Sequence, residues 1–298
     1  MISKYDKIIF VTGGTGKQGG AVVHHLLKNG WRVRTMTRNA SKPAAKALVD
    51  KGVEVIQGSL DDTGAVARAL TDVYGVYSVQ SFEDGVEAEI RQGMLLADLA
   101  KEAAVGHFVY SSVAAADKNT GIVFFDSKWQ IEQHIRRISL PYTIFRPVFF
   151  MENFLMPQIR SSIINGLLTL PIKPEKRLQM IAVDDIGAFV AQAFESPDHW
   201  LCCTNEIAGD EITMCRAAQL FSKAIGREVR YSQMPIEEMR RVSEDYARMY
   251  EWFNDNNFSA DITKLRSFNA DLMNFEMWLN RSNWQQYAIA EAVWGRKI

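Results

Sequence analysis

Several features are missing from this sequence, and each absence argues against a class of protein. The 298 residues contain no run of about eighteen apolar residues, so no membrane-spanning helix is expected. The opening segment MISKYDK leads into a predicted strand without a secretion signal, and we expect a cytoplasmic protein. Because 34 Lys and Arg residues nearly balance 35 Asp and Glu residues, direct nucleic-acid binding is not expected.

Cysteine is scarce, and the chain has no internal repeat or low-complexity linker. Cys202, Cys203 and Cys215 do not have the spacing of metal ligands, so we expect no metal site. We interpret the three thiols as reduced and structural. The alternative is that the adjacent pair, Cys202 and Cys203, acts as a redox switch.

The sequence does have the apolar content and the alternation of an α/β protein. Hydrophobic residues make up 47% of the chain, enough for a large core. Predicted strands at 8–11, 32–37, 53–57, 75–79, 107–110 and 142–145 alternate with predicted helices at 21–28, 65–70, 87–104 and 126–138. This alternation predicts a Rossmann fold, a doubly wound parallel sheet with helices on both faces.

After Pro147 the strict alternation loosens, which predicts a smaller α+β C-terminal lobe. We expect a dinucleotide-binding Rossmann domain over 1–150 and the smaller lobe over 151–298, with segments at about 178–208 returning to the main sheet. Beyond Pro147 the sequence predicts strands at 167–172, 178–182, 205–208 and 229–233, a helix at 183–196 that packs on the main sheet, and a helix at 213–225. Residues 285–298 are predicted to form a loose tail.

The stretch IIFVTGGTGKQGG, residues 8–20, has the order of a buried strand, a glycine turn and a helix start. Gly13, Gly16 and Gly19 recur at intervals of three residues. In a dinucleotide site such glycines form a tight turn, let the backbone approach a pyrophosphate and pack the helix on the strand. The alternative is a purely structural turn. The residues expected to bind the dinucleotide here are Gly13, Gly14, Thr15, Gly16, Lys17, Gln18 and Gly19.

A basic residue follows the second predicted strand, where a site selective for NAD carries an acid. Arg38 stands there, with Lys42 and Lys46 close behind. A guanidinium matches a ribose 2′-phosphate in charge and geometry, so we expect NADP(H) as the cofactor. The alternative is that these are ordinary solvated charges.

Two further loops follow strands at the edge of the sheet where α/β proteins bind ligands. We expect these loops to border the adenine and the pyrophosphate. The residues concerned are Ser59, Leu60 and Asp61 after the third strand and Gln80, Ser81 and Phe82 after the fourth.

Four motifs, in this order along the chain, resemble those of the NmrA-like family of atypical short-chain dehydrogenases/reductases. They are TGGTGKQGG, TRN at 37–39, Phe125–Lys128 followed by Glu132, and RPVFFMENF at 146–154. The likeness is greatest to members that act as NADPH sensors and weaker to plant isoflavone and benzylic-ether reductases. The resemblance implies an NADP(H)-binding Rossmann domain, a small lobe for a substrate or regulatory protein partner, and a homodimer.

The same resemblance implies roles for individual residues. Arg38 and Lys42 would meet the 2′-phosphate, and Arg91 and Lys128 would reach the cofactor. Ser59 departs from the family, whose members tend to carry an acid there. The loop on the nicotinamide side would comprise Phe149, Phe150, Met151, Glu152 and Asn153.

The wider superfamily uses a tyrosine four residues before the lysine as its proton donor, because the ammonium lowers the pKa of the phenol. Phe124 occupies that position and cannot donate a proton. Lys128 remains either a catalytic residue or a fixed cation that binds the ribose and phosphate. The candidate replacement donors are Tyr110, Ser111, Ser112, Glu152, Asn153, His107 and His134.

Two functions follow, and the sequence leaves open whether the protein is an enzyme. We favour a sensor that changes conformation with NADP(H) occupancy, because of Phe124. The alternative is an NADPH-dependent reductase of a small aromatic or quinone-like substrate that uses Lys128. A binding module without a cofactor would leave the glycine turn and Arg38 unexplained.

Overall fold

The computed structural model of the chain describes residues 6–284 and 286–287. The chain divides into two units, and each takes two separate stretches of sequence. The first unit runs to Pro147 and resumes over Val183–Glu206, and the second comprises Val148–Ala182 and the chain from Ile207 onward. Most of the tail predicted at 285–298 lies outside the described residues.

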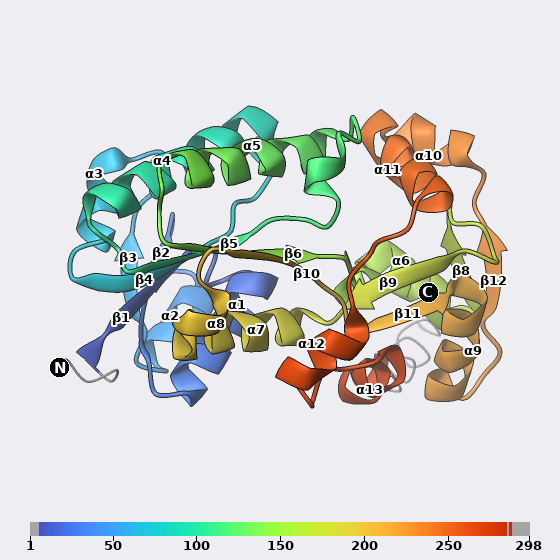
Figure 1. Cartoon of the computed structure of the whole chain (residues 1–298). Helices are drawn as coiled ribbons and strands as arrows, with labels where there is room; N and C mark the ends of the chain where they lie inside the picture. Colours follow the sequence, from blue (N-terminus) through green and yellow to red (C-terminus); the bar gives the residue numbers. More distant parts are fainter. Residues whose placement is uncertain (1–5, 285, 288–298) are drawn as a thin grey trace. The chain divides into compact units, whose positions relative to one another are not determined.

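A seven-stranded sheet with the order β10-β6-β5-β4-β1-β2-β3 forms the centre of the first unit (Figure 1). The pairs β3–β2, β2–β1, β1–β4, β4–β5 and β5–β6 are all parallel. This is the strand order of a dinucleotide-binding fold, and the predicted fold class is confirmed. The strands are β1 Ile8–Val11, β2 Arg32–Thr37, β3 Glu54–Gln57, β4 Val73–Ser78, β5 His107–Ser111, β6 Tyr142–Pro147 and β10 Cys203–Ile207.

Helices cover both faces of this sheet (Figure 1). On one face lie α3 (Thr63–Ala69), α4 (Val86–Glu102) and α5 (Val123–Arg137); on the other lie α1 (Lys17–Lys28), α2 (Pro43–Val49), α7 (Val183–Glu195) and α8 (Pro197–Trp200). All four residues of β1 are buried, as expected for a strand covered on both faces. The core beneath α3, α4 and α5 includes Phe10, Val76, Phe108, Leu96 and Ile131.

Two helices begin three or more residues earlier than predicted. α1 begins at Lys17 and includes two glycines, which the sequence suggested should precede the helix. α5 begins at Val123, whereas the prediction of a helix from 126 placed Lys128 in the first turn; Lys128 lies in the second turn, and that prediction was wrong. Val123, Phe124 and Phe125 are poor helix formers by intrinsic preference, but Phe125 is only 4% exposed, and its packing overrides that preference.

The second unit contains two small sheets. One has the order β11-β9-β7 and the other pairs β12 with β8. Because β9 pairs with β7 and β11, the chain returns to the first unit only at Val183. The strands are β7 Phe149–Phe150, β8 Leu167–Leu170, β9 Arg177–Ile181, β11 Asp210–Thr213 and β12 Arg230–Gln233; the helices are α6 Pro157–Ile164, α9 Met214–Ile225, α10 Ile236–Val242, α11 Glu244–Asp255, α12 Ile262–Phe268 and α13 Phe275–Arg281.

Aromatic side chains form the core of the second unit. Phe154 packs edge to face against Phe221 and Phe275, each with ring centroids 5.4 Å apart. Trp278 stacks on Phe275, also at 5.4 Å. Such contacts add to the free energy gained by burying large apolar side chains.

Candidate functional site

The glycine turn connects β1 to α1 at the carboxyl edge of the sheet. Gly13 has a φ of +62°, a conformation that other residues rarely adopt, and Gly16 N–H donates to Gly13 O at 2.8 Å. A Cβ on Gly19 would lie 2.2 Å from Gly13 O, so no side chain fits there. The first amide groups of α1 have no partner within the helix and carry its positive dipole, which suits a bound anion.

The other residues of this turn divide into exposed and anchored side chains. Thr15 and Lys17 are exposed. Gly14 lies against β2, because a Cβ there would be 2.4 Å from Thr35 Oγ1. Gln18 is anchored: its Oε1 accepts from Ser111 Oγ at 2.8 Å and Tyr77 Oη at 3.3 Å. These bonds fix the first turn of α1 to β5 and β4.

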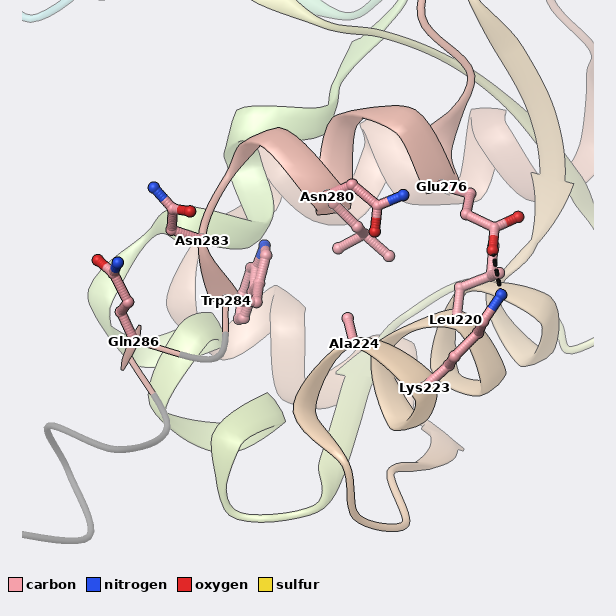
Figure 2. Close-up of a pocket in the computed structure, with 9 residues that line it drawn as sticks. Leu220, Lys223, Ala224, Glu276, Asn280, Asn283, Trp284 and Gln286 are labelled. Carbon is pink, nitrogen blue, oxygen red and sulfur yellow. Dashed lines mark hydrogen bonds and ion pairs between the residues drawn. The ribbon is translucent and has the colours of Figure 1, made fainter.

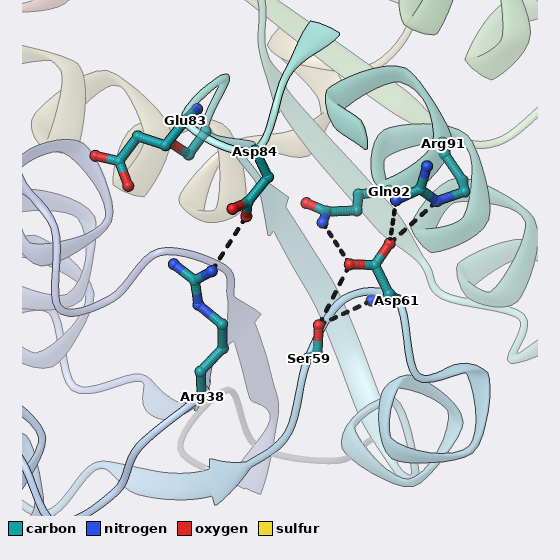
Figure 3. Close-up of polar contacts among 8 residues, drawn as sticks. Arg38, Ser59, Asp61, Glu83, Asp84, Arg91 and Gln92 are labelled. Carbon is teal, nitrogen blue, oxygen red and sulfur yellow. Dashed lines mark hydrogen bonds and ion pairs between the residues drawn. The ribbon is translucent and has the colours of Figure 1, made fainter. Parts of the chain in front are cut away.

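Arg38 follows the last residue of β2 and forms an ion pair with Asp84, which the sequence analysis did not predict as a site residue. Its Nη1 donates to Asp84 Oδ2 at 3.1 Å (Figure 3). The two side chains are 69% and 52% exposed. Lys42 is the N-cap residue of α2 and is exposed, as is Lys46. The predicted 2′-phosphate residues therefore lie at one end of β2 and on the helix that follows.

The loop after β3 is tied to α4 by Asp61. Its Oδ1 accepts from Arg91 Nη2 at 2.7 Å, and its Oδ2 accepts from Gln92 Nε2 at 2.8 Å (Figure 3). The bonds from Arg91 and Gln92 outweigh burial and lower the pKa of Asp61. Ser59 Oγ accepts from the Asp61 amide at 3.2 Å, and Leu60 packs against the core. Arg91 and Asp61, both predicted to meet the cofactor, thus meet each other.

The segment after β4 contains a buried polar atom with no partner. Gln80 is 9% exposed; its Nε2 donates to Ser78 Oγ at 2.9 Å, and its Oε1 has no hydrogen bond within the described chain. Ser112 Oγ, after β5, is likewise buried and without a partner among the described residues. Since β4 and β5 are neighbouring parallel strands with Ser78 opposite Tyr110, these two atoms follow adjacent strand ends. Ligand hydroxyl or amide groups would satisfy them.

Phe82 covers part of the same edge. Phe82 is 45% exposed, and the centroid of its ring lies 5.1 Å from that of the Phe124 ring. Ser81 Oγ accepts from the Glu83 amide at 3.1 Å, which turns the segment back toward α4.

Lys128 is held by a buried carboxylate. Its Nζ forms an ion pair with Glu89 Oε1, and Ser127 Oγ donates to Glu89 Oε2 at 2.6 Å. Glu89 lies on α4 and is 1% exposed, whereas the Lys128 side chain is 17% exposed. The carboxylate of Glu89 therefore balances the positive charge of Lys128.

The candidate proton donors on the sheet are engaged elsewhere. Tyr110 lies in the core beneath α4 and α5, and burial raises the pKa of its phenol well above the ordinary value. Burial also raises the pKa of Tyr77. Ser111 donates to Gln18, as described above. His107 is at the amino end of β5, the opposite end from the glycine turn, and burial lowers its pKa to about 4.

Two of the remaining candidates, His134 and Glu152, are in contacts of their own, whereas Ser112 Oγ has no partner among the described residues. His134 Nε2 lies 2.6 Å from Asp98 Oδ1 on α4, near the last turn of α5. Glu152 Oε1 accepts from Trp278 Nε1 at 2.9 Å within the second unit. Asn153 is half-buried in the 3₁₀ helix η3 (Met151–Leu155).

Two residues of the family-like motifs form a buried ion pair. Arg146 Nε and Nη2 each donate to Glu132, both at 2.8 Å, and Arg146 Nη1 lies 2.9 Å from Asp117 Oδ2. Glu132 is fully buried. Burial opposes the charged form of Arg146, but the two carboxylates outweigh it and raise the pKa of the guanidinium. These residues join α5, β6 and η2 (Ala116–Lys118).

The segment predicted to lie on the nicotinamide side of the cofactor belongs to the second unit. Phe149 and Met151 are buried there, and Phe149 packs 5.7 Å from Phe154. Phe150, Glu152 and Asn153 are half-exposed. Their proposed contact with a cofactor stays a prediction.

The second unit has a pocket of its own with a volume of about 400 Å³ (Figure 2). It lies between α9 and α13, which are joined by an ion pair of 2.6 Å from Lys223 Nζ to Glu276 Oε1. None of its residues was predicted to bind the cofactor. The lining residues are Leu220, Lys223, Ala224, Glu276, Leu279, Asn280, Asn283, Trp284 and Gln286.

The described residues contain no cluster of His, Cys, Asp or Glu arranged to hold a metal ion. None of the helices in that part of the chain combines the length and apolar character needed to cross a membrane. Cys202 and Cys215 are exposed free thiols, and Cys203 is half-buried.

The sequence analysis did not predict three residues that form contacts at this site: Asp84, Glu89 and Gln92. Glu89 and Gln92 did give a signal, because they stand on the apolar face of α4 beside Ala88 and Leu96, where a polar residue needs a partner. Asp84 gave none, because it is one of several acids in an exposed loop.

The sheet order, the glycine turn and the basic residue after β2 define a Rossmann-fold protein of the dinucleotide-binding type. More specifically, the chain belongs to the NmrA-like family, whose model matches residues 5–287.

Individual similarities agree with this assignment. The chain is 28% identical to an NmrA-like family domain-containing protein of Dictyostelium discoideum over 88% of this chain and 96% of that protein. Its fold is similar to that of a triphenylmethane reductase of Citrobacter sp., with a TM-score of 0.81, 21% identity and coverage of 93% and 99%. The negative transcriptional regulator NmrA in complex with NAD gives a TM-score of 0.80, 19% identity and coverage of 97% and 98%.

Proposed function

We propose that this protein binds NADP(H) and acts in the cytoplasm as a sensor or regulator of the NADPH/NADP⁺ ratio, with weak or no dehydrogenase activity. Dinucleotide binding is supported by the glycine turn and by the exposed Arg38. The unpartnered Gln80 Oε1 and Ser112 Oγ offer further polar contacts at the same edge of the sheet.

The observation that carries the regulatory assignment is the state of Lys128. Its ammonium is neutralised by buried Glu89, and Phe124 stands one turn before it in place of a phenol. A lysine whose charge is balanced by a carboxylate can still donate hydrogen bonds to ribose hydroxyls. It lowers the pKa of a neighbouring proton donor less than an unpaired cation would. The residues present therefore support cofactor binding better than proton transfer.

A sensor also requires that the cofactor bind two conformations with different affinity. The response would then be a change in the binding of a regulatory protein partner or of a second copy of the chain. A homodimer is part of this proposal.

The test is calorimetric titration with NADPH and NADH, followed by an NADPH-consumption assay with quinones, aldehydes and triarylmethane dyes. We expect binding selective for NADPH, no consumption, and a change in dimerisation or protease protection on binding. Steady consumption that is lost in Lys128→Ala and retained in Lys118→Ala, an exposed lysine in η2, would refute the sensor assignment.

The second candidate is an NADPH-dependent reductase of a small aromatic or quinone-like substrate. It is favoured by the exposed ring of Phe82 beside Phe124, which offers an aromatic surface close in sequence to the proposed cofactor residues. Acceptors of this kind place little demand on a protein proton donor: a cationic triaryl dye needs only hydride, and a quinone can take its proton from water. The fold neighbour named as a triphenylmethane reductase is consistent with this alternative.

A further inference from the structure

Arg38, on which the proposed NADP(H) selectivity depends, already has an anionic partner. Asp84 Oδ2 accepts from Arg38 Nη1 at 3.1 Å, across 46 positions of sequence (Figure 3). Asp84 lies in the segment between β4 and α4, next to Gly85, the N-cap residue of α4. The pair is exposed, with 52% of the Asp84 side chain accessible to solvent.

A ribose 2′-phosphate and the Asp84 carboxylate would seek the same cation. The phosphate carries the larger negative charge, about −1.5 to −2 at pH 7, and more acceptor oxygens. With Asp84 in place, the incoming phosphate must displace a carboxylate and then tolerate a like charge nearby. A ribose 2′-hydroxyl meets neither difficulty, because a carboxylate accepts a hydrogen bond from it.

We propose that Asp84 is a selectivity-determining residue of this site: it competes with the 2′-phosphate for Arg38 and so limits the preference for NADP(H) over NAD(H). This inference rests on the proposed dinucleotide site. The competition is modest, because an exposed ion pair contributes little free energy.

The same segment carries a second contact that links it to α5. Phe82, two residues before Asp84, packs on Phe124 at 5.1 Å, and Gly85 N–H donates to Phe82 O at 3.0 Å. Release of Asp84 by a 2′-phosphate therefore removes one of the contacts that hold the segment bearing Phe82.

The test compares Asp84→Asn with Glu83→Gln, each titrated calorimetrically with NADP⁺ and NAD⁺ at two salt concentrations. Glu83 is the neighbouring exposed acid, and no contact joins its side chain to Arg38 in Figure 3. Asp84→Asn should bind NADP⁺ about two- to fivefold more tightly, and less so at high salt, without gaining affinity for NAD⁺. Glu83→Gln removes the same charge and should change neither affinity by more than about 1.5-fold, since its contribution is screened.

Three results would overturn the proposal: equal effects of the two variants, equal gains for both dinucleotides in Asp84→Asn, or weaker NADP⁺ binding in Asp84→Asn. If the parent protein prefers NADP⁺ but Asp84→Asn leaves that preference unchanged, this inference alone fails. If the parent binds neither dinucleotide, the proposed function fails and this inference with it. Circular dichroism of both variants checks that the exposed substitutions leave the fold intact.

Discussion

Arg38 is the side chain whose charge would distinguish the two dinucleotides. Arg38→Ala should weaken NADP(H) binding about 10- to 100-fold, because it removes a charge-assisted contact to phosphate. NADH binding should change by less than about threefold, since its ribose carries no phosphate. Titration with both cofactors measures the difference.

Arg32→Ala is the matched control for this substitution. Arg32 is exposed at the opposite end of the same strand, β2. It should leave both affinities unchanged. Equal losses for NADPH and NADH in Arg38→Ala would contradict the assignment of Arg38 to the 2′-phosphate.

Glu89 is the buried carboxylate that fixes Lys128 and Ser127. Glu89→Ala should destabilise the protein by about 3 kcal/mol, because it leaves a partly buried lysine without its counter-charge. The double variant Glu89→Ala/Lys128→Met should recover part of this loss, since no unpaired charge then remains. Urea unfolding of the single and double variants measures the coupling.

Glu87→Ala provides the comparison for Glu89, because Glu87 is an exposed acid on the same helix, α4. Its effect should stay within about 0.5 kcal/mol. If Glu89→Ala is no more destabilising than Glu87→Ala, the buried pair does not contribute to stability.

The join between β1 and α1 depends on close backbone contact. In Gly19→Ala the new Cβ would lie 2.2 Å from Gly13 O, so the turn and the helix start must move apart. We expect a loss of about 1–3 kcal/mol in the free energy of unfolding. Dinucleotide affinity should fall at least tenfold, because the amide groups at the start of α1 would be displaced from the anion.

Gly64→Ala, on α3, separates this effect from a general effect of losing a glycine. A Cβ at Gly64 meets its nearest neighbours at 3.4 Å, an ordinary contact. The free energy of unfolding should change by less than about 1 kcal/mol, and cofactor affinity should be unchanged. Normal dinucleotide binding by Gly19→Ala would show that the turn does not hold the pyrophosphate.

In the first unit, the buried His107 should make the free energy of unfolding depend on pH. Thr143 Oγ1 donates to the carbonyl of Trp200 at 2.7 Å, so its oxygen accepts from His107 Nε2–H at 2.8 Å. His107 Nδ1 then has no hydrogen bond within the described residues. Protonation would bury a charge without an acceptor, and burial accordingly lowers the pKa of His107 to about 4.

The direction of the pH effect follows from proton binding. In the unfolded chain His107 binds a proton below about pH 6.5, whereas in the folded chain it does so only below about pH 4. The free energy of unfolding therefore falls as the pH is lowered from 6.5 to 4. The loss between pH 7 and pH 5 should be about 2 kcal/mol. His107→Gln should show a flatter profile in urea unfolding at the two pH values.

His24→Gln is the control, because His24 is exposed on α1. It should keep the pH dependence of the parent protein. A parent profile that matches that of His107→Gln would show that His107 does not carry the effect.

The division of the whole chain was only partly foreseeable from the sequence. The loosening of the α/β alternation after Pro147 marked the first exit from the Rossmann unit, which occurs between Pro147 and Val148. The return at Val183 was placed about five residues too early, because β9 has the apolar pattern of any buried strand. Which sheet a strand joins depends on its hydrogen-bonding partners, here β7 and β11.

The sequence by itself determined the features that depend on neighbouring residues. The glycine turn and the order of the predicted strands and helices follow from local conformational preference and periodicity. The position of Arg38 after a predicted strand and that of Phe124 four residues before Lys128 are read directly from the sequence. The fold class followed in turn, because alternating strands and helices have few ways to bury their apolar faces.

Only the tertiary structure decided which charges meet. Lys128 pairs with Glu89, 39 positions away, and Arg38 with Asp84, 46 positions away. Strand order and helix packing bring such residues together, and sequence spacing carries no information about them. The partner of each cation, and with it the chemistry that the cation supports, therefore depends on the fold.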